Sequence, residues 1–309
     1  GETSILMVEA ALRFMETNRD RPVFTVLWYG PPHFPYTALE EDMEGLPTEL
    51  DSRVANLFGE IIAMDRSIGM LRDGLRDMGL AENTLIWFCS DNGGRDHEPD
   101  SVGGLRGFKG SLYEGGIRVP GIIEWPGRIQ PMVTDFPAST MDIMPTIVDL
   151  LDLPEESMLA VHDGESILPL LEGRIPERTH PIPFTMKGTA LIDGHFKLLQ
   201  LGRGKAAKWA LFDLERDPGE TTDVSGEFPE RFEKMKAEAE TMVASVQASA
   251  EGKDYPAGKV IQPQRGEDWS TMKEYRALYE TFAKLKPGWN PPAKGKTKRD
   301  QEYNCHIGC

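Results

Sequence analysis

Two adjacent residues with hard oxygen atoms, Asp91 and Asn92, stand between an apolar run and two glycines in the stretch TLIWFCSDNGG, residues 84–94. Carboxylate and carboxamide oxygens suit Ca²⁺ or Mg²⁺ far better than softer metals. The glycines free the backbone, so both side chains could face one ion. Asp-Asn-Gly is also common turn chemistry, in which the Asp side chain bonds its own backbone. The stretch is therefore compatible with a metal-binding turn or with an Asx turn that ends a strand.

A second candidate is the glycine-rich stretch GGLRGFKGSLYEGGIRVP, residues 103–120, which carries Arg106, Lys109 and Arg118. The formal net charge of the chain is −16, so positive charge is concentrated here against the overall balance. Such a loop could build a local anion site in a chain whose field repels anions. Lys109 offers a compact point charge with three donors, which suits a tetrahedral oxyanion. The alternative is a solvated basic loop.

Histidine supplies a third kind of candidate. His33 lies in YGPPHFPY, directly after an apolar run and between prolines that stiffen the loop. It could donate to an anionic oxygen or act as a general acid near neutral pH, although a loop histidine can also be structural or merely exposed. His97 lies close to the Asp91 turn. The other histidines show no metal-ligand spacing: His162, His180, His195 and His306.

Composition bounds the class of protein. The chain has 309 residues, of which 39% are hydrophobic and 27% charged, a soluble globular profile. No apolar run reaches the roughly 18–20 residues of a membrane span, and the acidic balance argues against a nucleic-acid partner. The three cysteines form no disulfide framework. Cys89 is expected to be a small buried hydrophobe, whereas Cys305 and Cys309 could pair or bind metal.

Alternating elements of an α/β layer are predicted to position these side chains. Apolar residues at three- and four-residue steps indicate helices, and short β-branched or aromatic runs indicate strands. Helices are predicted over 2–18, 52–78 and 139–152, and strands over 22–30, 84–89 and 117–125. The alternation predicts a mostly parallel sheet flanked by helices, with ligand sites at the carboxyl ends of its strands. Asp91 and Asn92 lie at such an end.

The pattern changes after about residue 152. Short strand-like runs separated by turns predict a small antiparallel sheet, and residues 228–248 predict an amphipathic helix. Three domains are therefore predicted: an α/β domain over 1–152, a subdomain with the small sheet and helix over 153–250, and an extended tail over 251–309.

Taken in order, these pieces resemble the sulfatase family of the alkaline phosphatase superfamily. The motifs that carry the likeness include MDRSIGMLRDGLRDMGLAENTLIWFCSDNGG (64–94), GLRGFKGSLYEGGIRVPGIIEWPGRI (104–129) and LFDLERDPGETTDVSGEFP (211–229). The likeness runs from near residue 1 to about residue 235. It implies an alkaline phosphatase-like fold and the hydrolysis of sulfate esters, with residues 1–152 as the C-terminal half of the catalytic domain.

Carried over residue by residue, the resemblance implies that Asp91 and Asn92 are two ligands of a catalytic Ca²⁺, with Mg²⁺ less favoured. Lys109 would contact the sulfate and balance charge on the leaving oxygen. His33, in the family's Pro-His-x-Pro position, would hydrogen-bond the sulfate or protonate the leaving group. Arg118 would make a structural ion pair.

The resemblance also bears on substrate and location. Arg95 and His97 are candidates for contacting the substrate beyond its sulfate group. A sulfated small molecule or carbohydrate is the implied substrate, and the implied location is the periplasm or the outside of the cell. The same groups would also suit a phosphoester or phosphonate monoester hydrolase of the superfamily, which remains an alternative.

The sulfatase nucleophile is a formylglycine made from the first residue of Cys/Ser-x-Pro/Ala-x-Arg, and no Cys or Ser here has Pro or Ala two residues on. The resemblance thus implies that the nucleophile and the remaining metal ligands precede Gly1, on an N-terminal half of the same enzyme. This chain alone is expected to be inactive. A non-catalytic binding or assembly module that lacks the nucleophile is the other alternative.

Overall fold

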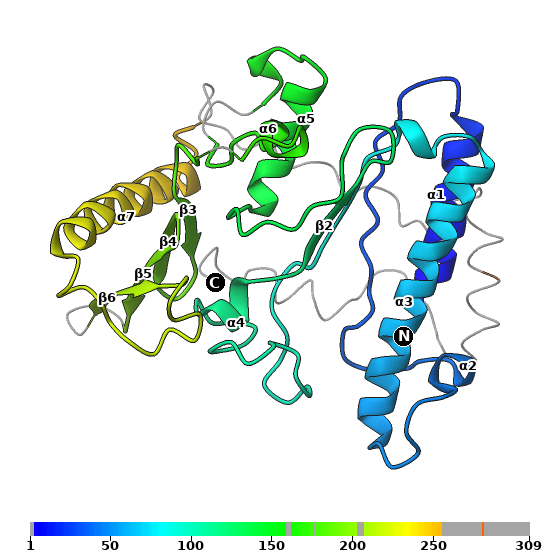
Figure 1. Cartoon of the computed structure of the whole chain (residues 1–309), viewed down its shortest axis with the longest axis horizontal. Helices are drawn as coiled ribbons and strands as arrows, with labels where there is room; N and C mark the ends of the chain where they lie inside the picture. Colours follow the sequence, from blue (N-terminus) through cyan, green and yellow to red (C-terminus); the bar gives the residue numbers. More distant parts are fainter. Residues whose placement is uncertain (1–2, 159–161, 176, 203–206, 255–279, 281–309) are drawn as a thin grey trace. The chain divides into compact units, whose positions relative to one another are not determined.

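The computed structural model describes residues 3–158, 162–175, 177–202, 207–254 and 280 of the chain (Figure 1). By their backbone contacts these residues form two compact units, which are described separately. The first unit holds residues 3–84 and 125–127, together with Glu280. The second holds residues 85–124 and the described residues from 128 to 254.

The predicted domain ranges, 1–152, 153–250 and 251–309, stay predictions, because compactness of backbone contacts does not test them. Residues 255–309 lie outside the described residues except for Glu280. The predictions made for three terminal residues lie outside them too: Cys305, His306 and Cys309.

Two long helices dominate the first unit and confirm the predicted helices at 2–18 and 52–78. α1 packs against α3, and Gly74 of α3 permits their close approach, because a Cβ there would stand 2.6 Å from Leu12 Cδ2. The helices of this unit are α1 (Ser4–Thr17), α2 (Glu40–Met43), α3 (Ser52–Asp77) and the 3-10 turn η1 (Ala81–Asn83). The buried apolar side chains of α1 and α3 are Val8, Ala11, Met15, Leu57, Ala63, Leu71 and Leu75.

Residues 22–30 form no strand, so the prediction of a buried strand there is wrong. A strand needs a neighbouring backbone to complete its hydrogen-bond ladder, and no described strand pairs with this segment. Its apolar side chains at alternate positions, Phe24, Val26 and Trp28, are 69%, 57% and 85% exposed. The sequence pattern of a strand is present, but a pairing partner among the described residues is not.

The second unit begins with a two-stranded sheet. β1 (Ile86–Cys89) pairs with β2 (Gly121–Glu124), with Ile86 opposite Glu124 and Cys89 opposite Gly121. This pairing is antiparallel, so the predicted mostly parallel sheet is not found among the described strands. A parallel neighbour needs a long crossover, usually a helix. The connection at 90–120 instead carries only the one-turn helix α4 (Glu114–Ile117) and returns the chain beside β1 in the opposite direction.

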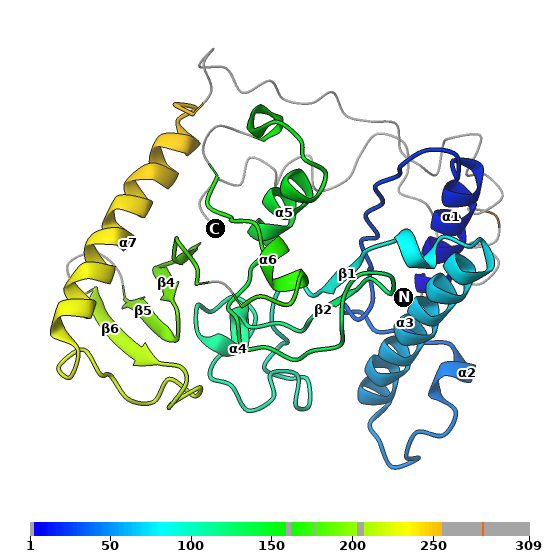
Figure 2. The same cartoon turned by 45° about the horizontal axis from the view of Figure 1, so that its top comes forward.

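The predicted small antiparallel sheet and its helix are confirmed. The sheet has the order β3-β4-β5-β6, and α7 lies along it in both views (Figures 1 and 2). Its strands are β3 (Ile182–Thr185), β4 (Thr189–Asp193), β5 (Phe196–Leu201) and β6 (Lys208–Asp213), and the helix is α7 (Pro229–Ala250). One apolar face of the sheet packs on α7, with Leu198, Leu211 and Met235 fully buried.

A buried ion pair organises the helical part of the second unit. Arg178 reaches both oxygens of the fully buried Asp142, at 2.7 Å and 3.0 Å. Asp142 also accepts from the amides of Ser139 and Glu165. The helices of this part are η2 (Thr140–Asp142), α5 (Ile143–Leu150), η3 (Glu155–Ser157) and α6 (Leu168–Leu171). The predicted helix at 139–152 is thus confirmed as a 3-10 turn that continues into α5.

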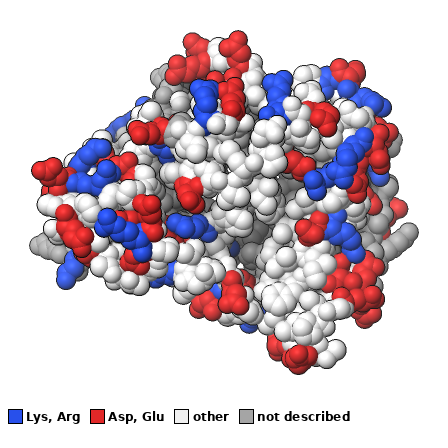
Figure 3. Space-filling model, in the orientation of Figure 1, with Lys and Arg blue, Asp and Glu red and all other residues white. Residues whose placement is uncertain are grey.

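The surface carries both signs of charge. Acidic and basic side chains are interspersed over the face of the molecule seen in Figure 3. Among the described residues, no helix combines the length and the apolar character that a membrane crossing requires.

Candidate active site

The turn after β1 presents Asp91 at the surface and Asn92 half buried. The Ser90 hydroxyl closes this turn by donating to the Asn92 carbonyl at 3.0 Å. In the part of the chain that the structure describes, no hydrogen bond or ion pair engages the Asp91 carboxylate. The turn therefore does not use the aspartate as an Asx turn would, and its carboxylate oxygens face solvent.

Two main-chain hydrogen bonds join this turn to the loop that carries Lys109. The Lys109 amide donates to the Gly94 carbonyl at 2.8 Å, and the Gly93 amide donates to the Gly116 carbonyl at 3.0 Å. The exposed Lys109 thus belongs to a loop bonded directly to the Asp91-Asn92 turn. The structure brings these three predicted residues into one place on the second unit.

Glycine is required where the turn and the loop touch. A Cβ on Gly93 would stand 1.9 Å from the Gly115 carbonyl oxygen, and one on Gly116 would stand 2.2 Å from the Ser111 carbonyl oxygen. Real Cβ atoms do not approach this closely, so a side chain on Gly93 would force the turn and the loop apart, and one on Gly116 would distort the loop itself. The glycines after Asn92 therefore allow contact with the loop as well as a change of direction.

The predicted ion pair of Arg118 is present. Arg118 Nε lies 2.6 Å from Glu114 Oε2, at the end of the Lys109 loop. Glu114 is 2% exposed and also contacts Lys197, which lies in β5. Sequence reasoning missed Lys197 and Glu220, which meet at this point. The Asp-Pro-x-Glu turn at 217–220 was the available signal, but it names no partner.

Arg95 and His97 lie on the exposed loop that follows the turn. The Arg95 amide donates to Glu98 Oε2 at 2.9 Å, and the Arg95 carbonyl accepts from the Ser101 hydroxyl. His97 Nδ1 lies 3.1 Å from Asp96 Oδ1. These contacts fix the loop without assigning either side chain to a substrate, so their substrate roles stay predictions.

His33 belongs to the first compact unit, whereas Asp91, Asn92 and Lys109 belong to the second. It is exposed, and its Nδ1 lies 2.7 Å from the Phe34 carbonyl oxygen. Its role beside the other three residues stays a prediction.

Cys89, at the end of β1, is half buried and free. Burial raises the pKa of its thiol, and the charge of Asp91 raises the pKa further. The thiol is therefore held in its protonated, poorly nucleophilic form. The expectation of a buried cysteine is met only in part, because Cys89 is half buried.

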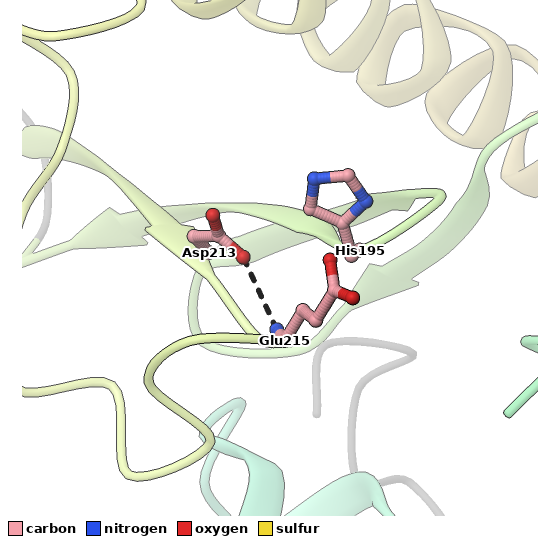
Figure 4. A group of neighbouring side chains, drawn as sticks. All are labelled: His195, Asp213 and Glu215. Carbon is pink, nitrogen blue, oxygen red and sulfur yellow. Dashed lines mark hydrogen bonds between the residues drawn. The ribbon is translucent and has the colours of Figure 1, made fainter.

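A different group of possible metal ligands lies at one end of the β5–β6 pair. The donor atoms of His195, Asp213 and Glu215 all lie within 4.8 Å of one another (Figure 4). Asp213 Oδ1 accepts from the amides of Glu215 and Arg216, and its Oδ2 lies 3.2 Å from Arg216 Nε. The Asp213 carboxylate therefore already caps the turn after β6. Only the pairing of the strands, invisible to sequence spacing, brings His195 to it.

Comparisons with known sequences bear on the whole site. The sulfatase family model matches residues 3–153. Steryl-sulfatase from Homo sapiens is 37% identical over 196 residues, which cover 59% of this chain and 31% of that protein. Arylsulfatase A from Homo sapiens is 31% identical over 253 residues, which cover 71% of this chain and 48% of that protein. The chain thus spans less than half the length of these two relatives.

Solved structures give the same result for the fold. Ps i-CgsB is 30% identical with a TM-score of 0.69, covers 77% of this chain, and is matched over 54% of its own; it has also been crystallised with k-i-k-neocarrahexaose. PsFucS1 sulfatase from Pseudoalteromonas sp. shows the shared fold, with a TM-score of 0.61 and 23% identity over 81% of this chain and 52% of its own. These comparisons confirm the resemblance to the sulfatase family that the motifs predicted.

Proposed function

We propose that this chain forms part of a sulfuric ester hydrolase, a sulfatase that cleaves sulfate esters with the help of Ca²⁺. The observation that carries the proposal is the 2.8 Å hydrogen bond between the Lys109 amide and the Gly94 carbonyl. It holds a cationic loop against a turn that presents carboxylate and carboxamide oxygens. A cation and hard oxygen ligands side by side are what a metal-assisted reaction at a sulfate group needs.

The donor set fits Ca²⁺ in kind. Asp91 offers a carboxylate that no described hydrogen bond or ion pair occupies, and Asn92 offers a carboxamide oxygen next to it. Ca²⁺ takes roughly six to eight oxygen ligands, so these two residues would be part of a larger set. Mg²⁺ is the less favoured ion. When bound, the ion would polarise the sulfate and stabilise developing negative charge.

The other candidate residues act on the substrate. Lys109 would donate to the sulfate oxygens and balance charge on the leaving oxygen, because an ammonium presents three donors to a tetrahedral anion. His33 would hydrogen-bond the sulfate or give a proton to the leaving group. Arg95 and His97, exposed beyond the turn, would contact the part of the substrate that carries the sulfate.

Attack on sulfur is assigned to a group outside these residues. The sequence holds no Cys/Ser-x-Pro/Ala-x-Arg motif from which a formylglycine could be made. The proposal therefore places the formylglycine, with the remaining metal ligands, on an N-terminal half of the complete enzyme, and expects this chain alone not to turn over. Alignments that cover 31% and 48% of the two sulfatases support this division.

A sulfated carbohydrate or small molecule is the proposed substrate. Support comes from Ps i-CgsB, which was crystallised with k-i-k-neocarrahexaose, and from steryl-sulfatase and arylsulfatase A, whose names point to smaller esters. A periplasmic or extracellular location belongs to the same proposal. Cell fractionation with antibodies against this chain would test the location.

Relative turnover of two matched substrates tests the reaction. The full-length gene product is expected to hydrolyse an aryl sulfate at least about a hundredfold faster, in kcat/KM, than the aryl phosphate with the same leaving group. A preference for the phosphate would replace this proposal with a phosphoester hydrolase. Turnover of neither substrate by a folded, full-length protein would favour a non-catalytic module.

A further inference from the structure

One residue, Glu220, holds both ends of the loop that carries Lys109. Its main-chain carbonyl accepts a hydrogen bond from Arg106 Nη1, at the beginning of the loop. Its side-chain Oε2 accepts from the Glu114 amide at 2.6 Å, at the end of the loop. Glu220 follows these residues by 114 and 106 positions, so the two bonds fasten the loop to a distant part of the second unit.

A fully buried lysine neutralises this contact. Lys197 Nζ lies 2.9 Å from Glu114 Oε1 and 2.8 Å from Glu220 Oε1, and the three side chains are between 0% and 3% exposed. Burying a charge costs several kcal/mol unless opposite charges compensate it. The Lys197 ammonium, between two carboxylates, is compensated in this way. Removing it would leave two carboxylates facing each other in the interior.

Apolar packing places Lys197 at this point. It lies in β5, one residue from the fully buried Leu198, which faces α7. Because side chains alternate along a strand, Lys197 shares the opposite face with Leu199. That face packs against Leu112 and Tyr113 of the Lys109 loop.

Two further features, one of Glu220 and one of the loop, accompany these contacts. The φ of Glu220 is +53°, in the left-handed region that residues other than glycine adopt only when their surroundings impose it. Arg106, which donates to the Glu220 carbonyl, also lies over the Tyr113 ring, 4.1 Å from its centroid. Arg106 and Tyr113 lie toward the two ends of the loop, so this contact holds the two ends together.

We propose that Glu220 and Lys197 are positioning residues for Lys109. Direct contacts lead from Lys197 and Glu220 to Glu114, and from the adjoining Gly115-Gly116 segment to Gly93. The small antiparallel sheet therefore sets the place of the cationic loop beside the Asp91 turn. The role of Lys109 rests on the proposed function. The attachment of the loop by Glu220 and Lys197, here called the clamp, can be tested without that function.

Hydrogen exchange of the full-length gene product, read by mass spectrometry, tests the clamp. In Glu220→Ala the amides of residues 106–116 are expected to exchange about tenfold faster or more, while α7 and β4–β6 keep their protection. Glu220→Gln keeps an acceptor for the Glu114 amide and is expected to stay within about threefold of the wild type. Lys208→Met, an exposed lysine of β6, is the control and should change nothing.

Lys197→Met is expected to give the same local loss as Glu220→Ala. Where Lys197→Met fails to fold, the double variant Lys197→Met with Glu220→Gln replaces it, because this variant removes one buried negative charge together with the ammonium. Unchanged exchange over 106–116 in folded Glu220→Ala overturns the proposal. Equally faster exchange over the whole second unit also overturns it, because the residues would then serve stability alone.

Turnover of an aryl sulfate adds the functional readout. Glu220→Ala is expected to lower kcat/KM about tenfold, and Glu220→Gln to recover most of it. A normal kcat/KM in Glu220→Ala despite a loosened loop would contradict the positioning role. If the wild type hydrolyses no sulfate ester, the proposed function fails, and the exchange comparison still decides whether the clamp exists.

Discussion

Asp91 stands on a fixed backbone although its carboxylate is exposed. Main-chain hydrogen bonds hold Gly93 and Gly94 to the loop of Lys109 on the one side, and β1 holds the chain on the other. A ligand oxygen on a fixed backbone loses little entropy when an ion binds.

Replacing the Asp91 carboxylate should weaken Ca²⁺ binding. Asp91→Asn in the full-length gene product is expected to raise the Kd for Ca²⁺ at least about tenfold, measured by isothermal titration calorimetry, because a charged ligand is lost. Asp100→Asn is the matched control: Asp100 is an exposed acid of the following loop with a φ of +50°, which Asn tolerates. Equal affinities in the two variants would remove Asp91 from the metal site.

Lys109 is expected to matter for turnover and not for folding. Lys109→Ala should lower kcat/KM for an aryl sulfate by about a hundredfold, with an unchanged Tm, because an exposed side chain contributes little to stability. Lys109→Arg keeps the charge in a different shape and should recover only part of the loss. Steady-state kinetics, with Lys208→Ala as the control, measure the kcat/KM of both Lys109 variants, and thermal unfolding measures their Tm. A Tm that falls with the rate would mean that Lys109 is structural.

At the scale of elements, local sequence patterns predicted the helices and strand ends better than they predicted the pairing of strands. Apolar periodicity found α1, α3 and α7, and the Ser-Asp-Asn-Gly-Gly stretch found the end of β1. The direction of β2 and the absence of a strand at 22–30 depend on which backbone lies alongside, which no local pattern encodes. Lys197 and Glu114 meet across 83 residues for the same reason.

The close contact between the turn and the loop leads to a prediction for Gly93. Gly93→Ala should lower the free energy of unfolding by about 1–3 kcal/mol and reduce turnover, because its Cβ would overlap the Gly115 carbonyl. Urea unfolding measures the first effect. Gly121→Ala in β2 meets nothing within 4 Å and is the control. Equal stability of the two variants would show that the turn and the loop do not touch in solution.

Glu220, a residue of the clamp, is also expected to make the stability of the protein depend on pH. Burial raises the pKa of Glu220 above its ordinary value of 4.5, and the attraction of Lys197 opposes this without cancelling it. A raised carboxyl pKa means that the folded state binds the proton more tightly than the unfolded state. The contribution of Glu220 to stability is therefore greatest below pH 4.5 and is lost as pH rises through the raised pKa.

Urea midpoints between pH 4 and 7 measure this effect. The free energy of unfolding of the wild type, relative to Glu220→Gln, should fall with rising pH by at most about 1.4 kcal/mol per unit. Glu227→Gln, which changes an exposed carboxyl seven residues further along the chain, is the control. A difference that grows with pH would show that Lys197 dominates and that the pKa of Glu220 is lowered.

At the scale of the whole molecule, the net negative charge of the chain is unfavourable for the proposed anionic substrate. A net charge of −16 repels a sulfate ester at long range, so the cations of the Lys109 loop must act locally. The sulfatase family model matches residues 3–153, which include the turn and the loop. The complete enzyme, and not this chain alone, is expected to carry the activity.

Calcium-dependent release of sulfate from an aryl sulfate by the full-length gene product is the most direct test. We predict turnover that a Ca²⁺ chelator abolishes, that added Ca²⁺ restores, and that Lys109→Ala lowers by about a hundredfold. Turnover that persists in excess chelator, or that is unchanged in Lys109→Ala, would contradict a calcium-assisted sulfatase site built on these residues.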